Sequence, residues 1–233
     1  NIKLEDGTVL NQSIIRINYE HIPIQTLFPI AKAKIARLDI KKTGNYVGYI
    51  MGAGDEIPAA LRQVGYKVDM LADEDINETK LKKYDAIITG VRAYNTNTRL
   101  EFQQKILMKY VENGGNLIVQ YNTNRGLKTK DLAPYPLELS RDRVTVEEAE
   151  VRFLKPEHPI LNTPNKITEA DFENWVQERG LYFPNKWDDK FEAILSSNDL
   201  GETPKDGGLL TCKYGKGTYI YTGYSWFREL PAG

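Results

Sequence analysis

The sequence predicts a three-layer α/β fold with a mainly parallel sheet, a C-terminal β-hairpin and a short N-terminal β segment. Short apolar runs alternate with helical stretches over residues 45–121, which is the pattern of βαβ units. These runs lack a strict alternation with polar residues, which is typical of strands buried on both faces. Near the C-terminus, Gly215-Lys216 joins two β-rich runs at 207–214 and 217–224, which is a strong hairpin signal.

Residues 1–43 differ from the rest of the chain. Runs at 8–10, 13–19 and 33–40 have strand character, and a break at Pro23 separates the second from the third. This is too little sequence to form a domain alone. We therefore expect the tail of a preceding β-domain, or strands that pack on the next domain, and we assign residues 44–233 to the α/β domain.

Within that domain the expected elements follow in order. We predict strands at 46–50, 66–71, 85–90 and 116–121. A helix begins near Ile57 and ends at Gly65, a short helix closes between Leu81 and Tyr84, and a third occupies 102–111 before a Gly pair. Residues 126 to about 190 are rich in Pro, Asn and charge, so we predict a long irregular insertion there.

Composition excludes several classes of function. The chain has 233 residues and a net charge of -1, which gives no electrostatic reason to expect nucleic acid as a partner. No apolar run approaches the roughly 20 residues that span a bilayer. With one cysteine and two histidines, we expect no internal disulfide, no metal site and no cofactor. Because Asn1 is not an initiator Met and the chain stops just after a strand-like segment, we interpret it as a fragment of a longer protein.

Ligands of open α/β sheets bind beyond the carboxyl ends of the strands, where three loops are expected to converge. The loop Gly52-Ala53-Gly54-Asp55 superficially resembles a phosphate-binding loop. It lacks the third Gly of the dinucleotide motif and the Lys of a P-loop. A tight turn capped by Asp55 is the favoured interpretation.

The other two loops supply the candidate ligand-binding residues. These are Arg92, Tyr94, Asn95, Tyr121 and Asn122, with Trp175 or Glu178 contributed by the insertion. A guanidinium at this edge would suit a carboxylate or a hydroxyl-rich ligand. The alternative is that Arg92 only pairs with Glu178 or Asp55 and pins the insertion down.

Catalysis has weaker support in the sequence. A nucleophile in a strained turn is normally flanked by glycines, but Tyr121, Asn122 and Thr123 after the fourth strand include no usual nucleophile and no Gly. Cys212 lies within a strand pattern, where a buried inert thiol is expected. A hydrolase that uses His158 with Glu178 or Asp171 remains an alternative, although a His between prolines more often fixes a loop.

Several segments resemble the C-terminal region of large bacterial deacetylases of the PIG-L/LmbE type, which carry an appended class I glutamine-amidotransferase-like (ThuA-like) domain with a flavodoxin-like core. They span 21–29, 49–55, 90–96, 110–115, 175–183 and 214–223. The resemblance covers nearly the whole chain. It implies a parent protein that hydrolyses N-acetyl groups of amino sugars with a zinc-dependent domain elsewhere in its chain.

The resemblance implies that this chain does not itself carry out the hydrolysis. The empty nucleophile position beside a polar, aromatic rim favours a non-catalytic module that binds carbohydrate or packs against a deacetylase domain. The resemblance also suggests a periplasmic or secreted location. We expect no glutaminase activity, because the amidotransferase cysteine has no counterpart after the fourth strand. A purely structural domain that supports oligomerisation is a further alternative.

Overall fold

A computed structural model describes residues 2–32 and 39–232. The chain divides into two compact units, Asn1–Asp39 and Ile40–Gly233. In the smaller unit, β1 (Ile2–Lys3) pairs with β2 (Val9–Leu10), and β3 (Ile15–Ile17) pairs with β4 (Gln25–Leu27), both antiparallel. The strand expected at 33–40 lies mostly outside the described residues.

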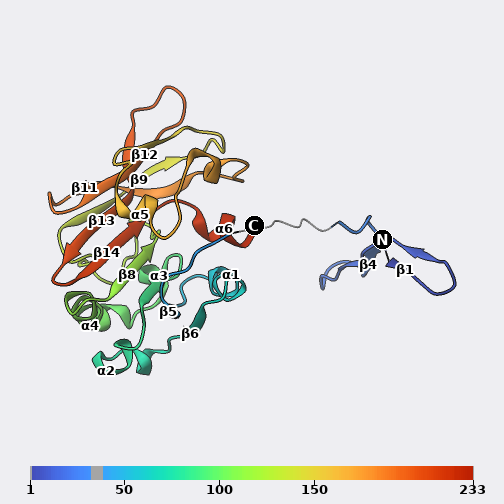
Figure 1. Cartoon of the computed structure of the whole chain (residues 1–233), viewed down its shortest axis with the longest axis horizontal. Coiled ribbons are helices and arrows are strands. Elements are labelled where there is room, and N and C mark those ends of the chain that lie inside the picture. The colour runs from blue at the N-terminus through green and yellow to red at the C-terminus, as the bar shows by residue number, and fades with distance from the viewer. Residues whose placement is uncertain (1, 33–38, 233) are drawn as a thin grey trace. The chain divides into compact units, whose positions relative to one another are not determined.

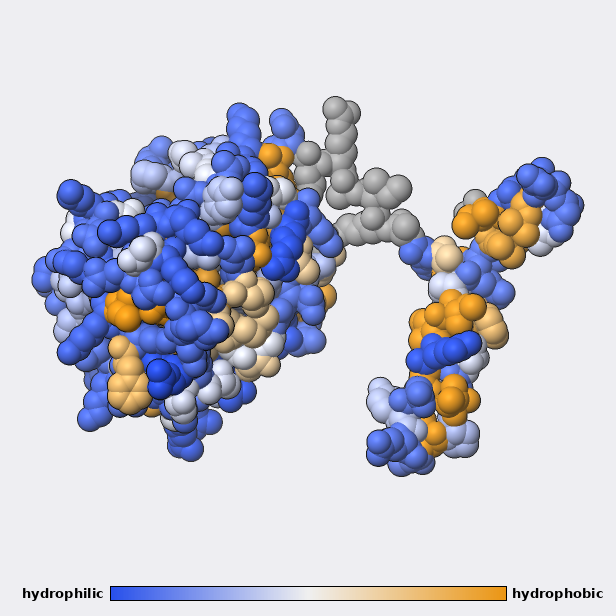
Figure 2. All heavy atoms as spheres, turned by 90° about the horizontal axis from the view of Figure 1, so that it is seen from below, coloured by the Kyte–Doolittle hydropathy of each residue, from blue (hydrophilic) through white to orange (hydrophobic). Residues whose placement is uncertain are grey.

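The two hairpins of the smaller unit bury little apolar surface. Figure 2 shows hydrophobic residues over much of the surface of this unit. Those with large exposed fractions include Ile2, Val9, Ile14, Tyr19, Ile24, Phe28 and Ile30. Because an isolated two-stranded hairpin is marginally stable in water, these residues need a further apolar surface to cover them.

The larger unit is built on an eight-stranded sheet of order β10-β12-β13-β14-β8-β7-β5-β6 (Figure 1). Its parallel part consists of β6 (Lys67–Met70), β5 (Tyr46–Ile50), β7 (Ala86–Thr89), β8 (Asn116–Gln120) and β14 (Gly217–Thr222). Its antiparallel part consists of β13 (Lys205–Tyr214), β12 (Glu192–Ser197) and β10 (Val151–Phe153). The predicted mainly parallel sheet and the C-terminal hairpin are therefore confirmed.

Helices cover both faces of the sheet, as a three-layer fold requires (Figure 1). Successive residues of a strand point to opposite faces. Ile87 belongs to the core cluster beneath α4 (Leu100–Glu112) and α2 (Glu78–Leu81). Its neighbour Ile88 belongs to the cluster beneath α1 (Ile57–Gln63) and α6 (Trp226–Ala232). The shorter α3 (Ala93–Thr96) follows β7, and η1 (Asp73–Asp75) follows β6.

The prediction of an irregular insertion at 126–190 was wrong. This segment contains β9 (Leu137–Val144), β10, α5 (Pro159–Asn162), η2 (Glu169–Phe172) and β11 (Gly180–Trp187). Strand β9 pairs with the distant β11, and the ladder has three register shifts near Pro184. These irregularities break the two-residue period by which a strand is recognised in a sequence.

The sequence predicts no element after its last strand. Strand β14 ends at Thr222, and α6 occupies Trp226–Ala232. Its aromatic side chains lie against the sheet, where Phe227 packs on the Val47 cluster and Trp226 on the Phe172 cluster. This helix therefore brings aromatic residues to the carboxyl edge of the parallel strands.

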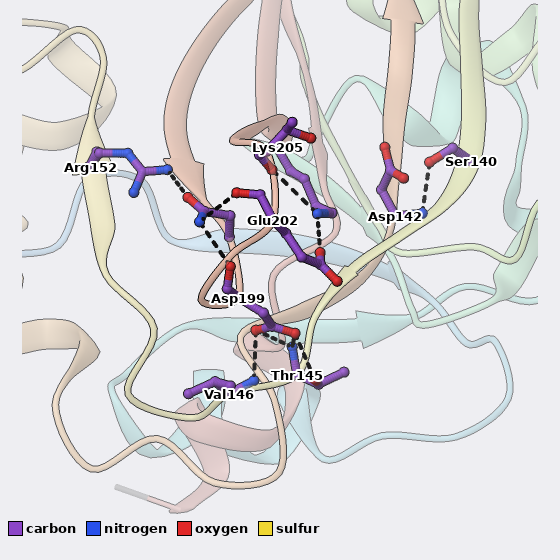
Figure 3. A network of polar contacts seen from close by, with 10 residues as sticks. Ser140, Asp142, Thr145, Val146, Arg152, Asp199, Glu202 and Lys205 are labelled. Carbon is purple, nitrogen blue, oxygen red and sulfur yellow. Dashed lines mark hydrogen bonds and ion pairs between the residues drawn. The ribbon is translucent and has the colours of Figure 1, made fainter.

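A polar network joins the connection between β9 and β10 to the turn between β12 and β13 (Figure 3). The Asp199 carboxylate, in the turn after β12, accepts hydrogen bonds from the backbone amides of Thr145 and Val146, all at 2.9–3.0 Å, and from the Thr145 hydroxyl at 2.7 Å. These hydrogen bonds lower the pKa of Asp199 against the opposing effect of its burial. The connection between β9 and β10 is thereby fixed to the β12–β13 hairpin.

Candidate functional site at the carboxyl edge of the sheet

The loop after β5 is a capped turn, as the sequence favoured. The Asp55 carboxylate accepts hydrogen bonds from the Tyr49 hydroxyl at 2.6 Å and from the Ile57 and Val91 amides at 3.1 Å. Gln120 of β8 donates to the same Tyr49 hydroxyl at 2.8 Å. Because a carboxylate is bound inside this loop, the loop is poorly suited to cradle a phosphate.

The loop after β7 contains a residue in an uncommon backbone conformation. Arg92 has φ 58°, in the left-handed region, and stands between β7 and α3. Non-glycine residues in this region are strained and are frequent at functional sites. Its amide donates to the Tyr121 carbonyl at 2.8 Å, which joins the loops after β7 and β8 as predicted from their neighbouring strands.

Three of the predicted ligand-binding residues are brought together here, two of them buried and Asn95 partly exposed. Tyr94 is fully buried, and its hydroxyl donates to Gln104 at 2.7 Å. Asn122 is also fully buried; its side-chain oxygen accepts from the Tyr94 amide and its side-chain nitrogen donates to the Gln120 carbonyl. Asn95 exchanges hydrogen bonds with the backbone of Thr123. Their amide and hydroxyl groups therefore hold the loops in place.

Trp175 was expected at the same edge, but it lies in another cluster. Its ring is 5% exposed and packs against Phe172 and Trp226 at centroid distances of 5.2 and 5.0 Å. Its indole nitrogen donates to the Asp171 carbonyl at 2.8 Å. The sequence could not show that the segment around Trp175 contributes to a separate core cluster.

The structure instead gathers Tyr121, Tyr182 and Phe227 into a partly exposed aromatic group, which we call the aromatic platform. The ring centroid of Tyr121 lies 6.2 Å from that of Tyr182 with the planes 7° apart, and 5.4 Å from that of Phe227. Tyr182 also has a left-handed backbone, with φ 53°. The candidate site residues taken from the sequence did not include Tyr182 and Phe227, because β11 and α6 were not predicted.

Charged groups surround the platform. The Glu178 carboxylate accepts from Arg228 Nε at 3.0 Å and from the buried Ser225 hydroxyl at 3.2 Å. Burial raises the pKa of Tyr121, and the guanidinium groups of Arg92 and Arg228 oppose this effect. The guanidinium carbon of Arg228 also lies 4.8 Å from the centroid of the Phe227 ring.

The alternative role of Arg92 as a pinning residue does not match these contacts. Glu178 is bound to Arg228, and Asp55 is bound to Tyr49 and two backbone amides. Over residues 2–32 and 39–232, the arginines in ion pairs are Arg99, Arg152 and Arg228. The guanidinium of Arg92 is exposed and available to solvent or a ligand.

The residues proposed for a hydrolase are held in separate networks. His158 caps α5, where its Nδ1 accepts from the Ile160 amide at 3.2 Å, and its Nε2 lies 3.9 Å from Glu192. Asp171 accepts hydrogen bonds from the amide and hydroxyl of Thr168, and Glu178 accepts one from Arg228. These contacts give His158 the loop-fixing role that its flanking prolines suggest.

Cys212 is buried in β13, and burial raises the pKa of its thiol to about 12. A protonated, inaccessible thiol is a poor nucleophile. In the described part of the chain, no group of three or more His, Cys, Asp or Glu side chains could hold a metal ion. The same residues contain no helix both long and apolar enough to cross a bilayer.

Three cavities accompany the sheet, and none of them includes the platform. Two of these three have volumes near 770 and 780 Å³ and lie at the amino edge of the parallel strands and beside α4. The third, near 460 Å³, lies next to Trp175. Tyr121, Tyr182 and Phe227 are each partly exposed, so solvent reaches the platform.

No protein-family model and no curated protein matches the chain. Solved structures do match its fold. A cytoplasmic protein from Salmonella typhimurium is 15% identical with a TM-score of 0.51, over 80% of this chain and 96% of that protein. The two chains share an α/β fold with a mostly parallel central sheet covered by helices.

Two further neighbours have lower scores. A protein described as ThuA-like, from Bacteroides uniformis, is 15% identical with a TM-score of 0.46, over 81% of this chain and 86% of its own. A protein from Thermoplasma acidophilum, described as one of the subunits of GMP synthase, is 12% identical with a TM-score of 0.49, over 82% of this chain and 92% of its own. Identities at this level describe the fold alone.

Proposed function

We propose that this chain is a non-catalytic amidotransferase-like domain that binds carbohydrate on its aromatic platform. The observation that carries the proposal is the partly exposed stack of Tyr121 on Tyr182, with Arg92 and the Glu178–Arg228 pair beside it. Aromatic faces pack against the C–H surface of a sugar ring, and guanidinium and carboxylate groups bind its hydroxyls.

The residues at the same edge of the sheet support a non-catalytic role. The turn after β8, where the sequence predicts the nucleophile position of this fold, carries Tyr121, Asn122 and Thr123, and the strained turn after β7 carries Arg92. Ser225, the hydroxyl nearest to Glu178, is fully buried and already donates to that carboxylate. None of these groups has a histidine partner among the contacts described above, so the activated nucleophile of this class of fold has no equivalent at the platform.

The role within a longer protein rests on the sequence resemblance alone. On that basis we place the domain beside a PIG-L/LmbE-type N-acetyl sugar deacetylase, for which it would hold the carbohydrate. The segment 1–43 fits the tail of a preceding β-domain, because its apolar side chains are largely exposed in the unit formed by its first 39 residues.

Titration calorimetry with oligomers of N-acetylglucosamine and of glucose tests the proposal. Binding is expected to weaken at least about tenfold in Tyr121→Ala, a loss of about 1.4 kcal/mol. Tyr46→Ala is the matched control, because Tyr46 is also exposed but lies at the amino end of β5. If neither oligomer series binds, or if Tyr121→Ala and Tyr46→Ala behave alike, the platform is not a carbohydrate site.

A further inference from the structure

The cavity of about 460 Å³ has an unusual arrangement of charge. Its lining includes the buried aromatic residues Phe172 and Trp175, with the buried Arg179 beside them. The acidic residues of its lining are Glu147, Glu148, Glu150, Glu169 and Glu173. Its volume lies in the range of small-molecule sites, roughly 300–1,000 Å³.

Arg179 is 5% exposed, yet its charge has no acidic partner in the described part of the chain. Its Nε donates to the Ala149 carbonyl at 2.9 Å, and its Nη1 donates to the Phe172 carbonyl. The guanidinium carbon lies 5.5 Å from the Trp175 ring centroid. Two neutral carbonyls and an aromatic face orient this cation without neutralising it.

Burial destabilises the charged form of the Arg179 guanidinium, which lowers its pKa. The glutamates nearby, Glu148 and Glu229, offset this lowering of the pKa only in part. A buried charge without a counter-ion is expensive, and an anion that enters the cavity removes part of the cost. The cavity therefore favours a ligand with a negative group next to the guanidinium of Arg179.

The acidic residues of the lining oppose a simple anion. Glu150 pairs with Arg152 at 3.1 Å, and Glu147 accepts from the Gln177 amide. Glu148, Glu169 and Glu173 are exposed, and the ion pairs and hydrogen bonds of the described residues leave their carboxylates free. A ligand that complements both the Arg179 cation and these free carboxylates has a carboxylate and, a few ångströms away, a positive group.

We propose that this cavity binds a zwitterionic α-amino acid, with its carboxylate on Arg179 and its ammonium group among Glu148, Glu169 and Glu173. The site is separate from the aromatic platform, although Glu178 of the platform's surroundings and Arg179 are neighbours in the sequence. A bidentate contact between a guanidinium and a carboxylate would set the orientation of the ligand.

Titration calorimetry of the 233-residue chain with each of the twenty free L-amino acids provides the first test. At least one is expected to bind, and its N-acetyl and carboxamide derivatives should each bind at least about tenfold more weakly, since each lacks one charge. If no amino acid binds at millimolar concentration, the proposal fails. It also fails if either derivative binds as tightly as the parent amino acid, because the site then recognises only one of the two charges of the ligand.

Variants locate the site. Glu173→Gln, at an exposed position, should weaken binding several-fold, and Glu157→Gln, exposed outside the cavity, should leave it unchanged. Arg179→Gln should abolish binding, whereas Arg179→Lys should retain part of it. Equal binding by the Glu173 and Glu157 variants would overturn the proposal even if the Arg179 variants do not fold. Tyr121→Ala should leave amino-acid binding intact, so this result is independent of the carbohydrate proposal.

Discussion

The backbone amide of Arg92 lies 2.8 Å from the carbonyl oxygen of Tyr121, to which it donates a hydrogen bond. Arg92 adopts a left-handed conformation, so this bond and the following turn of α3 fix where its side chain leaves the backbone. The exposed guanidinium is thus positioned beside the platform by the main chain, with no ion pair of its own in the described residues.

Replacing Arg92 separates its backbone role from its side-chain role. Arg92→Ala should change the free energy of unfolding by less than about 0.5 kcal/mol, because the side chain is exposed, while ligand binding at the platform is lost. Arg92→Gly should be more stable than Arg92→Ala by about 1 kcal/mol, because glycine tolerates a positive φ. Urea denaturation measures both. A loss of about 3 kcal/mol or more in Arg92→Ala would show that the side chain has a structural role instead.

Glu178 is expected to matter for stability as well as for the platform. Its side chain is 13% exposed and accepts from the buried Ser225 hydroxyl and from Arg228. Glu178→Ala leaves that hydroxyl without an acceptor, which should lower the free energy of unfolding by about 2 kcal/mol. Glu157→Ala, at an exposed site, should change it by less than about 0.5 kcal/mol. Similar losses in the two variants by chemical denaturation would contradict this role.

Two glycines in the loop after β5 should differ in their tolerance of a side chain. A Cβ on Gly52 would lie 2.1 Å from the Val91 carbonyl oxygen, so the two loops would have to separate. A Cβ on Gly54 would meet nothing within 4 Å, although φ of 109° is unfavourable there. We expect losses in unfolding free energy of about 3 kcal/mol for Gly52→Ala and about 1 kcal/mol for Gly54→Ala. Thermal denaturation in which Gly54→Ala is the less stable variant would refute the packing argument.

The sequence was informative where local pattern and final structure agree. Apolar runs between glycine stops predicted β5 to β8, and Gly65, with φ 92°, ends α1 as expected. Knowing that β7 and β8 are neighbours was enough to bring Arg92 and Tyr121 together. The direction of each side chain was not predictable, so Tyr94 and Asn122 were assigned to a ligand although the core encloses them.

The missed residues come from pairings between distant parts of the chain. Tyr182 lies on β11, whose partner β9 begins at Leu137 and whose ladder is interrupted by shifts in register. Phe227 lies on α6, a helix of seven residues with Pro231 inside it and no strong helical period in the sequence. Long-range pairing and packing determine both elements, and neither leaves a local signal.

Alkaline pH should destabilise the protein through its buried acidic hydroxyl and thiol groups. Burial raises the pKa of Cys212 and of Tyr110 to about 12 each, and it also raises the pKa values of Tyr94, Tyr219 and Tyr221. In the unfolded chain these groups ionise near their ordinary pKa values, roughly 8.5 for Cys and 10 for Tyr. The unfolded state therefore releases protons first, so the free energy of unfolding falls as pH rises.

The stability contributed by these groups is present in full below about pH 8.5 and is lost progressively from there toward about pH 12. The melting temperature should thus be level near neutral pH and fall steeply above about pH 10, where the tyrosines contribute together. Circular dichroism follows unfolding, and the ultraviolet absorbance of tyrosinate follows ionisation. Cys212→Ala should reduce the fall between about pH 8.5 and 10 while leaving the steeper part unchanged. Ionisation of every tyrosine near pH 10 in a chain that keeps its native circular dichroism would show that these hydroxyls are not buried as described.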